Sequence, residues 1–106
     1  MRDIEPLVEP PYLSLAKVLR YEPLAEELGV SEVARASGGF IEQYERAEGR
    51  KVELTPWWRR RRAGFVARHM AQLEDNREAL FTKKGLPTRR HLALIMWAYS
   101  PVPKQI

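Results

Sequence analysis

The sequence contains no cysteine, only two histidines and only two aspartates. The missing thiols exclude disulfide bonds, thiolate zinc sites and a cysteine nucleophile. His69 and His91 do not have a metal-binding spacing such as HExxH, and the glutamates show no paired arrangement typical of acid–base catalysis. We therefore expect a protein that is not an enzyme and that holds neither a metal ion nor a cofactor.

Long apolar runs are also missing. The longest spans residues 92–99 and has eight residues, whereas a membrane-spanning helix needs about 20. The first residues, MRDIEPLVEPP, carry acids and prolines where a signal peptide has an apolar run. The sequence thus predicts a cytoplasmic protein that is neither secreted nor inserted into a membrane.

Charge is divided unevenly between the two halves of the chain. The 106 residues, a length typical of a single domain, carry a formal net charge of +4. Residues 1–54 contain seven Lys and Arg against eleven Asp and Glu, a net charge of −4. Residues 55–106 contain eleven against three, a net charge of +8. The acidic half can neutralise only part of the basic half, and the remaining positive charge points to an anionic partner.

Apolar residues recur at helical spacing in short segments separated by glycine and proline, which predicts an all-α fold. Pro23 is expected to break the first helical stretch, and Gly29 to end the turns that follow it. The expected helices span residues 12–20, 23–28, 31–36, 40–48, 55–73 and 88–99. We expect a small single-domain bundle of about five short helices around a buried C-terminal helix. Extended arms are expected at residues 1–11 and 100–106.

Residues 55–73, TPWWRRRRAGFVARHMAQL, carry the strongest helix signals. Thr55 can cap this helix, and Pro56 suits its first position because a missing N–H costs nothing there. At about 100° per residue, one side is apolar and forms a core face made of Trp58, Phe65, Val66, His69 and Leu73. Beside that face, one edge carries Trp57, Arg61, Arg68 and Gln72.

The four consecutive arginines at residues 59–62 wrap around a full helical turn, so they do not form one patch. Arg62 points into the middle of the apolar face, where an unpaired charge costs on the order of several kcal/mol. We therefore predict that Arg62 pairs with a carboxylate of the acidic half and that its three arginine neighbours are more exposed. The candidate partners are Glu42, Glu45 and Glu53.

Residues 92–99, LALIMWAY, lack a polar face, and a helix without one is normally buried on all sides. We predict a helix here, capped by Thr88, with Leu94, Ile95 and Trp97 almost fully buried. The connection from the arginine-rich helix is long enough for parallel or antiparallel packing. The two basic helix starts would lie together in the first case and at opposite ends in the second.

Residues 24–40, LAEELGVSEVARASGGF, resemble the first part of a helix-turn-helix motif, with Gly29 in the turn and Ser31 opening a second helix. That second helix is interrupted by Gly38-Gly39 and has little basic character beyond Arg35. The surrounding half is acidic, which repels phosphate. An ordinary helical corner is therefore favoured over a DNA-reading motif.

The histidines and tryptophans divide between core and surface. His69, on the apolar face, is expected to be a core histidine bonded to a backbone group or a carboxylate, and His91 a surface residue that contacts phosphate. Trp58 and Trp97 fall where the core is expected. Trp57 lies off the apolar face, where an exposed indole would suit stacking on single-stranded bases.

The basic half supports a non-enzymatic protein that binds DNA or RNA through phosphate contacts, with little sequence preference. The expected binding residues lie off the apolar face and are Trp57, Arg59, Arg60, Arg61, Arg68, Lys83, Lys84, Arg89 and Arg90. The alternative is a protein-interaction module, a subunit or an inhibitor, that docks the same helix on an acidic partner. That partner can also be a second copy of the chain, as in a homo-oligomer.

Overall fold

The computed structural model describes residues 9–106. In chain order these form helices α1 (Leu15–Leu28), α2 (Glu32–Arg35), α3 (Phe40–Arg46), α4 (Pro56–Asp75) and α5 (Arg89–Ile95), with 3₁₀ turns η1 (Lys51–Glu53) and η2 (Pro103–Gln105). Within residues 9–106, β pairing is limited to one isolated bridge between Phe81 and Pro87, so the predicted all-α class is confirmed. No helix within residues 9–106 is long and apolar enough to cross a membrane. Most of the predicted N-terminal arm, residues 1–8, lies outside the described residues.

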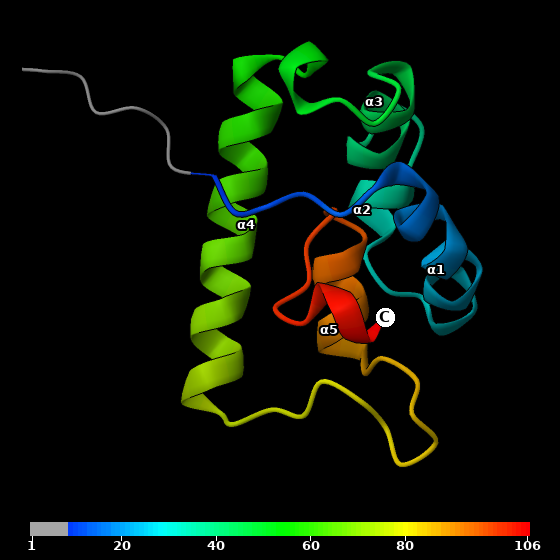
Figure 1. Cartoon of the computed structure of the whole chain (residues 1–106), viewed down its shortest axis with the longest axis vertical. Coiled ribbons are helices and arrows are strands. Elements are labelled where there is room, and N and C mark those ends of the chain that lie inside the picture. Colours follow the sequence, from blue (N-terminus) through cyan, green and yellow to red (C-terminus); the bar gives the residue numbers. More distant parts are fainter. Residues whose placement is uncertain (1–8) are drawn as a thin grey trace, which may run out of the picture.

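α5 lies in the middle of the fold, with α4 along one side and α1 along the other (Figure 1). α4 and α5 run in opposite directions, because residues 76–88 connect the lower end of α4 to the lower end of α5 in Figure 1. Of the two packing senses that the sequence permits, the antiparallel one is therefore observed. The two arginine-rich helix starts lie at opposite ends of the molecule.

α1 continues through Pro23, so the predicted break at this residue is wrong. The helix is capped at its start by the Ser14 hydroxyl, and Gly29 ends it with a left-handed φ of 66°. A proline inside a helix removes one backbone hydrogen bond and costs about 3 kcal/mol. Val18 and Ala25, one on each side of Pro23, are both fully buried. Their shared packing face holds the two halves of the helix in line.

α4 and α5 begin where the sequence predicts. The side-chain hydroxyl oxygens of Thr55 and Thr88 each accept a bond from the backbone N–H three residues later, at 3.4 Å. The predicted end of α5 is wrong, because the helix stops at Ile95 and residues 96–98 form a turn in which Ala98 has a left-handed φ of 59°. The Ala98 carbonyl accepts a 2.7 Å bond from the backbone N–H of Leu13, far away in the sequence.

The predicted burial of the apolar C-terminal segment is confirmed. Leu94 and Ile95 are fully buried, and Trp97 is 3% exposed. The Trp97 ring stacks on Phe40 of α3 and on Phe65 of α4, with ring centroids 5.1 and 4.7 Å apart. This aromatic cluster packs α3 and α4 against the turn that follows α5.

Arg62, in the first half of α4, is fully buried. Its guanidinium donates to four backbone carbonyls, those of Trp97 (2.6 Å), Ala98 (2.8 Å), Pro10 (2.8 Å) and Pro11 (2.7 Å). The guanidinium carbon also lies 3.5 Å from the centroid of the Tyr12 ring. One side chain thus joins α4 to the segment before α1 and to the turn after α5.

The predicted carboxylate partner of Arg62 is wrong. No carboxylate of residues 9–106 forms an ion pair with it, including the three candidate glutamates of the acidic half. Backbone oxygens take this place because the prolines before α1 and the turn after α5 leave carbonyls without helical partners. Burial lowers the pKa of Arg62 from its ordinary value, but an arginine stays charged in this setting. The predicted greater exposure of its three arginine neighbours is confirmed.

The predicted extended arm at the C-terminus is only partly observed. The chain leaves α5 without regular structure, but Pro103–Gln105 form the turn η2, which lies across α5 in Figure 1. The Pro103 carbonyl accepts a 2.9 Å bond from Lys17 Nζ, and Ile106 packs against the core. These contacts with α1 and the core shorten the arm.

Replacing Arg62 by Met should lower the free energy of unfolding by about 3–5 kcal/mol, because four buried carbonyls lose their donor. Urea unfolding followed by circular dichroism measures this change. Arg60→Met, at an exposed position two residues earlier, is the matched control and should stay within about 0.5 kcal/mol of the parent protein. Equal losses in the two variants would contradict the structural role assigned to Arg62 and its four carbonyl partners.

Candidate nucleic-acid interface

Arg59, one of the predicted binding residues, forms an ion pair within the fold. Its guanidinium pairs with both carboxylate oxygens of Glu9, at 3.1 and 2.5 Å, and the Glu9 side chain is nearly buried. The Tyr12 hydroxyl donates to the same carboxylate at 2.8 Å. The Arg59 bond is the main cause that lowers the pKa of Glu9, with burial opposing it. Burial and the Glu9 bond raise the pKa of Tyr12 to about 12.

Arg90 is also held within the fold. Its guanidinium pairs with both oxygens of Glu78 at 3.0 Å and donates to Gln72 Oε1 and His69 Nδ1 of α4, both at 2.8 Å. The Arg90 bond lowers the pKa of Glu78. Since arginine only donates, His69 Nδ1 must accept, and the ring is neutral. The predicted backbone or carboxylate partner of His69 is therefore wrong; burial, Arg90 and Arg68 lower its pKa.

Trp57 and Arg61 begin an exposed edge of α4. Trp57 is 55% exposed and meets the ring of Trp58 edge-on, with centroids 4.8 Å apart. The Arg61 guanidinium lies 5.2 Å from the Trp57 ring centroid and 5.9 Å from that of Trp58. Such a cation–π contact contributes about 0.5–1 kcal/mol at an exposed site. It presents a positive charge beside an accessible aromatic ring.

Arg68 lies further along this edge, and Arg60 lies on the neighbouring exposed side of the helix. Arg68 lies seven residues beyond Arg61, about 10 Å along the helix axis, and its guanidinium lies next to Gly64. Both arginines are exposed, as is Arg61. No carboxylate of residues 9–106 forms an ion pair with any of these three cations. We call the set formed by Trp57, Arg60, Arg61 and Arg68 the α4 edge.

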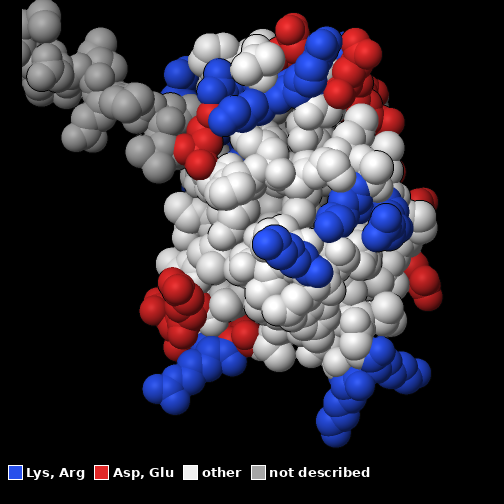
Figure 2. All heavy atoms as spheres, in the orientation of Figure 1, with Lys and Arg blue, Asp and Glu red and all other residues white. Residues whose placement is uncertain are grey.

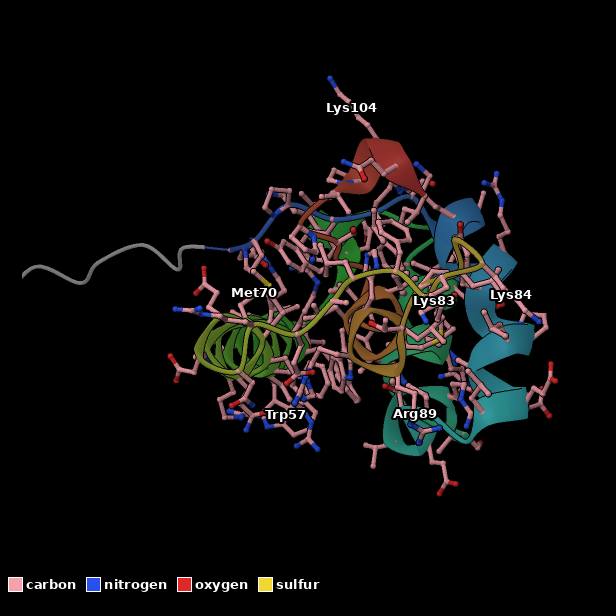
Figure 3. The ribbon with its side chains drawn as sticks, turned by 90° about the horizontal axis from the view of Figure 1, so that it is seen from below. Trp57, Met70, Lys83, Lys84, Arg89 and Lys104 are labelled. Carbon is pink, nitrogen blue, oxygen red and sulfur yellow. The ribbon has the colours of Figure 1, made fainter. Side chains whose placement is uncertain are left out.

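The other predicted binding residues divide between two places. Arg89 lies on the same side of the molecule as Trp57 and α2, whereas Lys83 and Lys84 lie toward α1 (Figure 3). Arg89 donates to the Leu28 carbonyl at the end of α1, at 2.5 Å. The two lysines instead border a separate hollow of about 500 Å³ with an apolar lining. The nine predicted residues therefore do not form one surface.

A groove made of two hollows lies on the side of α2 and borders Arg61 of the α4 edge. Its first hollow, about 500 Å³, lies between α2 and α4 and is lined by Glu32, Val33, Ala34, Arg61, Phe65 and Trp97. The second, about 300 Å³, is lined by Val30, Glu78, Arg89, Arg90 and Ala93. Both hollows reach Gly29 and Ser31 in the turn between α1 and α2, so they adjoin. We call them together the α2–α4 groove.

The opposite side of the molecule carries η2 and is the face seen in Figure 2. Its Lys and Arg side chains form separate groups, divided by uncharged surface and, at the top and lower left, by Asp and Glu. Uncharged atoms occupy most of its centre. Trp57, by contrast, lies on the α2 side of the molecule (Figure 3).

The sequence did not indicate the α2 wall of the groove. Val33, which is 62% exposed, and Glu32 belong to the acidic half, and no local pattern places them opposite the arginine-rich helix. Phe65 was assigned to the core, although its helical position next to Arg61 was a signal for the border of the groove. Tertiary packing brings residues of α2 and α4 to the walls of the same hollow.

The resemblance of residues 24–40 to a helix-turn-helix does not extend to a recognition helix. α2 is a single turn of four residues, and Ala36 after it is extended. A Cβ atom on Gly39 would lie 2.4 Å from the Val33 carbonyl oxygen, so glycine permits the sharp return of the chain toward α3. This segment is a helical corner, and its role here is to form the groove wall.

His91 is fully buried, so its predicted surface position is wrong. Its Nδ1 lies 2.8 Å from the Leu80 carbonyl oxygen, and its Nε2 lies 2.7 Å from Ser100 Oγ. The carbonyl can only accept, so Nδ1 carries the proton and the Ser100 hydroxyl donates to Nε2. Burial lowers the pKa of His91, with the Leu80 bond opposing it. His91 ties α5 to the segments on both of its sides and does not contact phosphate.

No protein-family model, curated protein or solved structure matches the chain. Within residues 9–106, no cluster of three or more His, Asp and Glu side chains is arranged to hold a metal ion.

Acidification should destabilise the fold through His91. Its pKa is lowered in the folded state, so the unfolded chain binds the proton first, near pH 6.5. The free energy of unfolding is expected to be constant above about pH 7 and to fall below about pH 6.5, with a slope of at most about 1.4 kcal/mol per pH unit for this group. His69, whose pKa is also lowered, acts in the same direction. Urea unfolding at a series of pH values measures the slope.

His91→Gln removes one titrating group and provides the control for this dependence. The variant is expected to be less stable at high pH, because two buried hydrogen bonds are weakened, but to show a shallower slope between about pH 7 and pH 5. A parent protein whose stability stays flat over this range would disprove the assignment of a buried neutral His91.

Proposed function

We propose that this protein binds nucleic acid through the α4 edge and the α2–α4 groove, without enzymatic activity and with little sequence preference. The observation that carries the proposal is the α4 edge itself. Arg60, Arg61 and Arg68 are exposed and meet no carboxylate of residues 9–106, and the Arg61 guanidinium lies 5.2 Å from the centroid of the open Trp57 ring. Unpaired cations next to an accessible aromatic ring are typical of surfaces that take up phosphate and bases.

Internal pairing reduces the number of cations available to a ligand. Glu9 and Glu78 neutralise Arg59 and Arg90 with bidentate pairs, and Arg62 is enclosed by carbonyls. Arg89 borders the groove and adds a further positive charge on its far side. The proposed binding residues are therefore Trp57, Arg60, Arg61, Arg68 and Arg89.

Little sequence preference follows from the chemistry of these residues. Arginines on an exposed helix edge bind phosphates of any sequence, whereas base reading in a duplex requires a helix or ribbon in the major groove. α2 is too short for that role. Gln72, whose amide could read a base edge, already accepts a bond from Arg90.

The positions of the histidines support a role without catalysis. His91 is enclosed in the core with Ser100, and His69 accepts a hydrogen bond from Arg90 through Nδ1. Neither ring lines the α2–α4 groove. A general base would have to reach a ligand in that groove.

One observation favours the alternative, a protein-interaction module. Val33 is 62% exposed on the wall of the first hollow, and Ala34, Phe65 and Trp97 extend the apolar lining. An exposed apolar surface bordered by charges also suits a protein partner. In that hypothesis the arginines of the α4 edge dock on an acidic partner or on a second copy of the chain.

The salt dependence of binding tests the proposed function. The logarithm of the affinity should fall linearly with the logarithm of the salt concentration, by about 0.9 per phosphate neutralised on a duplex and about 0.7 on a single strand. Replacing Arg60 and Arg61 by Ala should weaken binding to all sequences and flatten the slope by roughly one unit per lost contact. Fluorescence anisotropy with labelled DNA and RNA measures both quantities.

Lys83→Ala combined with Lys84→Ala provides the matched control, because it removes the same charge from a surface away from the α4 edge. This variant should bind nearly as tightly as the parent protein. If the parent protein binds neither DNA nor RNA at low salt, the nucleic-acid proposal is wrong. Self-association that is abolished by the Arg60 and Arg61 substitutions would then support the interaction module.

A further inference from the structure

The α4 edge and the first hollow of the α2–α4 groove differ in chemistry. The α4 edge supplies positive charge, whereas the hollow is lined on both sides by apolar groups, among them Phe65 and Val33. Trp57 stands on the α4 edge, with more than half of its surface exposed. A ligand that fills this surface has to present negative charge and flat apolar rings close together.

We propose that the ligand of this surface is a single-stranded nucleic acid, with its phosphates along the α4 edge and a base in the first hollow; this inference rests on the proposed function. In a duplex, the faces of the bases are covered by their neighbours, and only phosphates and groove edges reach a protein. A duplex would therefore use the arginines and leave Trp57 and the hollow without a partner. A single strand exposes base faces that stack on aromatic rings.

The charges on the two groove walls set the direction in which the strand lies. Arg61 is on the α4 wall and Glu32 is on the α2 wall. A phosphate is attracted to the first and repelled by the second, so the backbone follows α4 and the bases turn toward α2. The Arg61 guanidinium, held over the indoles of Trp57 and Trp58, is already oriented at this border.

The dimensions of the surface suit a short stretch of strand. Arg61 and Arg68 are about 10 Å apart along the helix axis, the rise of about three nucleotides in a duplex strand and of fewer in an extended one. The first hollow, about 500 Å³, falls within the range of small-ligand sites, about 300–1,000 Å³. Its lining includes Phe65 stacked on Trp97, and both rings are already packed together in the core. A base entering the hollow therefore meets ordered aromatic groups.

Substitutions at Trp57 test this inference. The probes are a short fluorescein-labelled single strand of mixed sequence and the duplex that it forms with its complement, both at the same low salt concentration. Trp57→Ala should weaken binding to the single strand by about 5- to 150-fold, the range that corresponds to about 1–3 kcal/mol of base stacking, and leave duplex binding nearly unchanged. Trp57→Phe keeps an aromatic face and should restore most of the affinity.

Trp57→Leu is the matched control, because it keeps apolar area but has no aromatic face. It should resemble the Ala variant, and circular dichroism should show that all three variants fold like the parent protein. Equal affinity for strand and duplex, with equal effects of Trp57→Ala on both, would overturn the single-strand inference and leave the proposed function standing. Loss of affinity in Trp57→Ala that Leu restores as well as Phe would also overturn it, because apolar contact rather than stacking would then be responsible. Absence of binding to both probes would reject the inference together with the proposed function.

Discussion

The fold depends on a buried positive charge that is balanced by backbone dipoles. Arg62 is the largest fully buried side chain of the described residues, and its four hydrogen bonds end on carbonyl oxygens of Pro10, Pro11, Trp97 and Ala98. Burying a guanidinium without such partners would cost several kcal/mol, on the order of the stability of a small domain. The segment before α1 and the turn after α5 therefore have to meet at one point of α4. This requirement sets the rotation of α4 about its own axis and, with it, the direction in which every other arginine of the helix points.

The inward position of Arg62 explains how the charges of the basic half are divided. With Arg62 in the core, Arg59 faces the segment before α1 and pairs with Glu9, while Arg60 and Arg61 face solvent. In the second half of α4, His69 and Gln72 accept hydrogen bonds from Arg90 of α5. The charge of Arg90 is neutralised by Glu78. The acidic residues thus neutralise particular arginines rather than the basic half as a whole. Among the cations that form no ion pair within residues 9–106, Arg60, Arg61 and Arg68 lie on the exposed side of α4, whereas Lys83 and Lys84 lie toward α1 (Figure 3).

The acidic half of the chain forms one wall of the candidate interface and also contributes charge to it. Gly29 ends α1 with a left-handed turn, and Gly39 allows a close return after the single turn of α2. Between these two glycines, Val33 and Ala34 are brought opposite Phe65, and the first hollow forms between them. The α2 wall of the groove and the α4 edge therefore come from opposite halves of the sequence. The alternative ligands, a nucleic acid and an acidic protein surface, make different use of these two walls, since stacking requires the ring of Trp57 and protein docking requires only apolar area.

The features that depend on neighbouring residues could be predicted from the sequence. The caps at Thr55 and Thr88, the burial of Val66 and the exposure of Trp57 follow from hydrogen-bonding geometry and helical period, which act within one or two turns. The features that depend on distant partners could not be predicted and are seen only in the folded chain. These are the carbonyl partners of Arg62, the continuity of α1 through Pro23, the burial of His91 and the antiparallel sense of α4 and α5. Each arises because a polar group or an apolar face is satisfied by residues far away in the chain, and no local pattern records which residues those are.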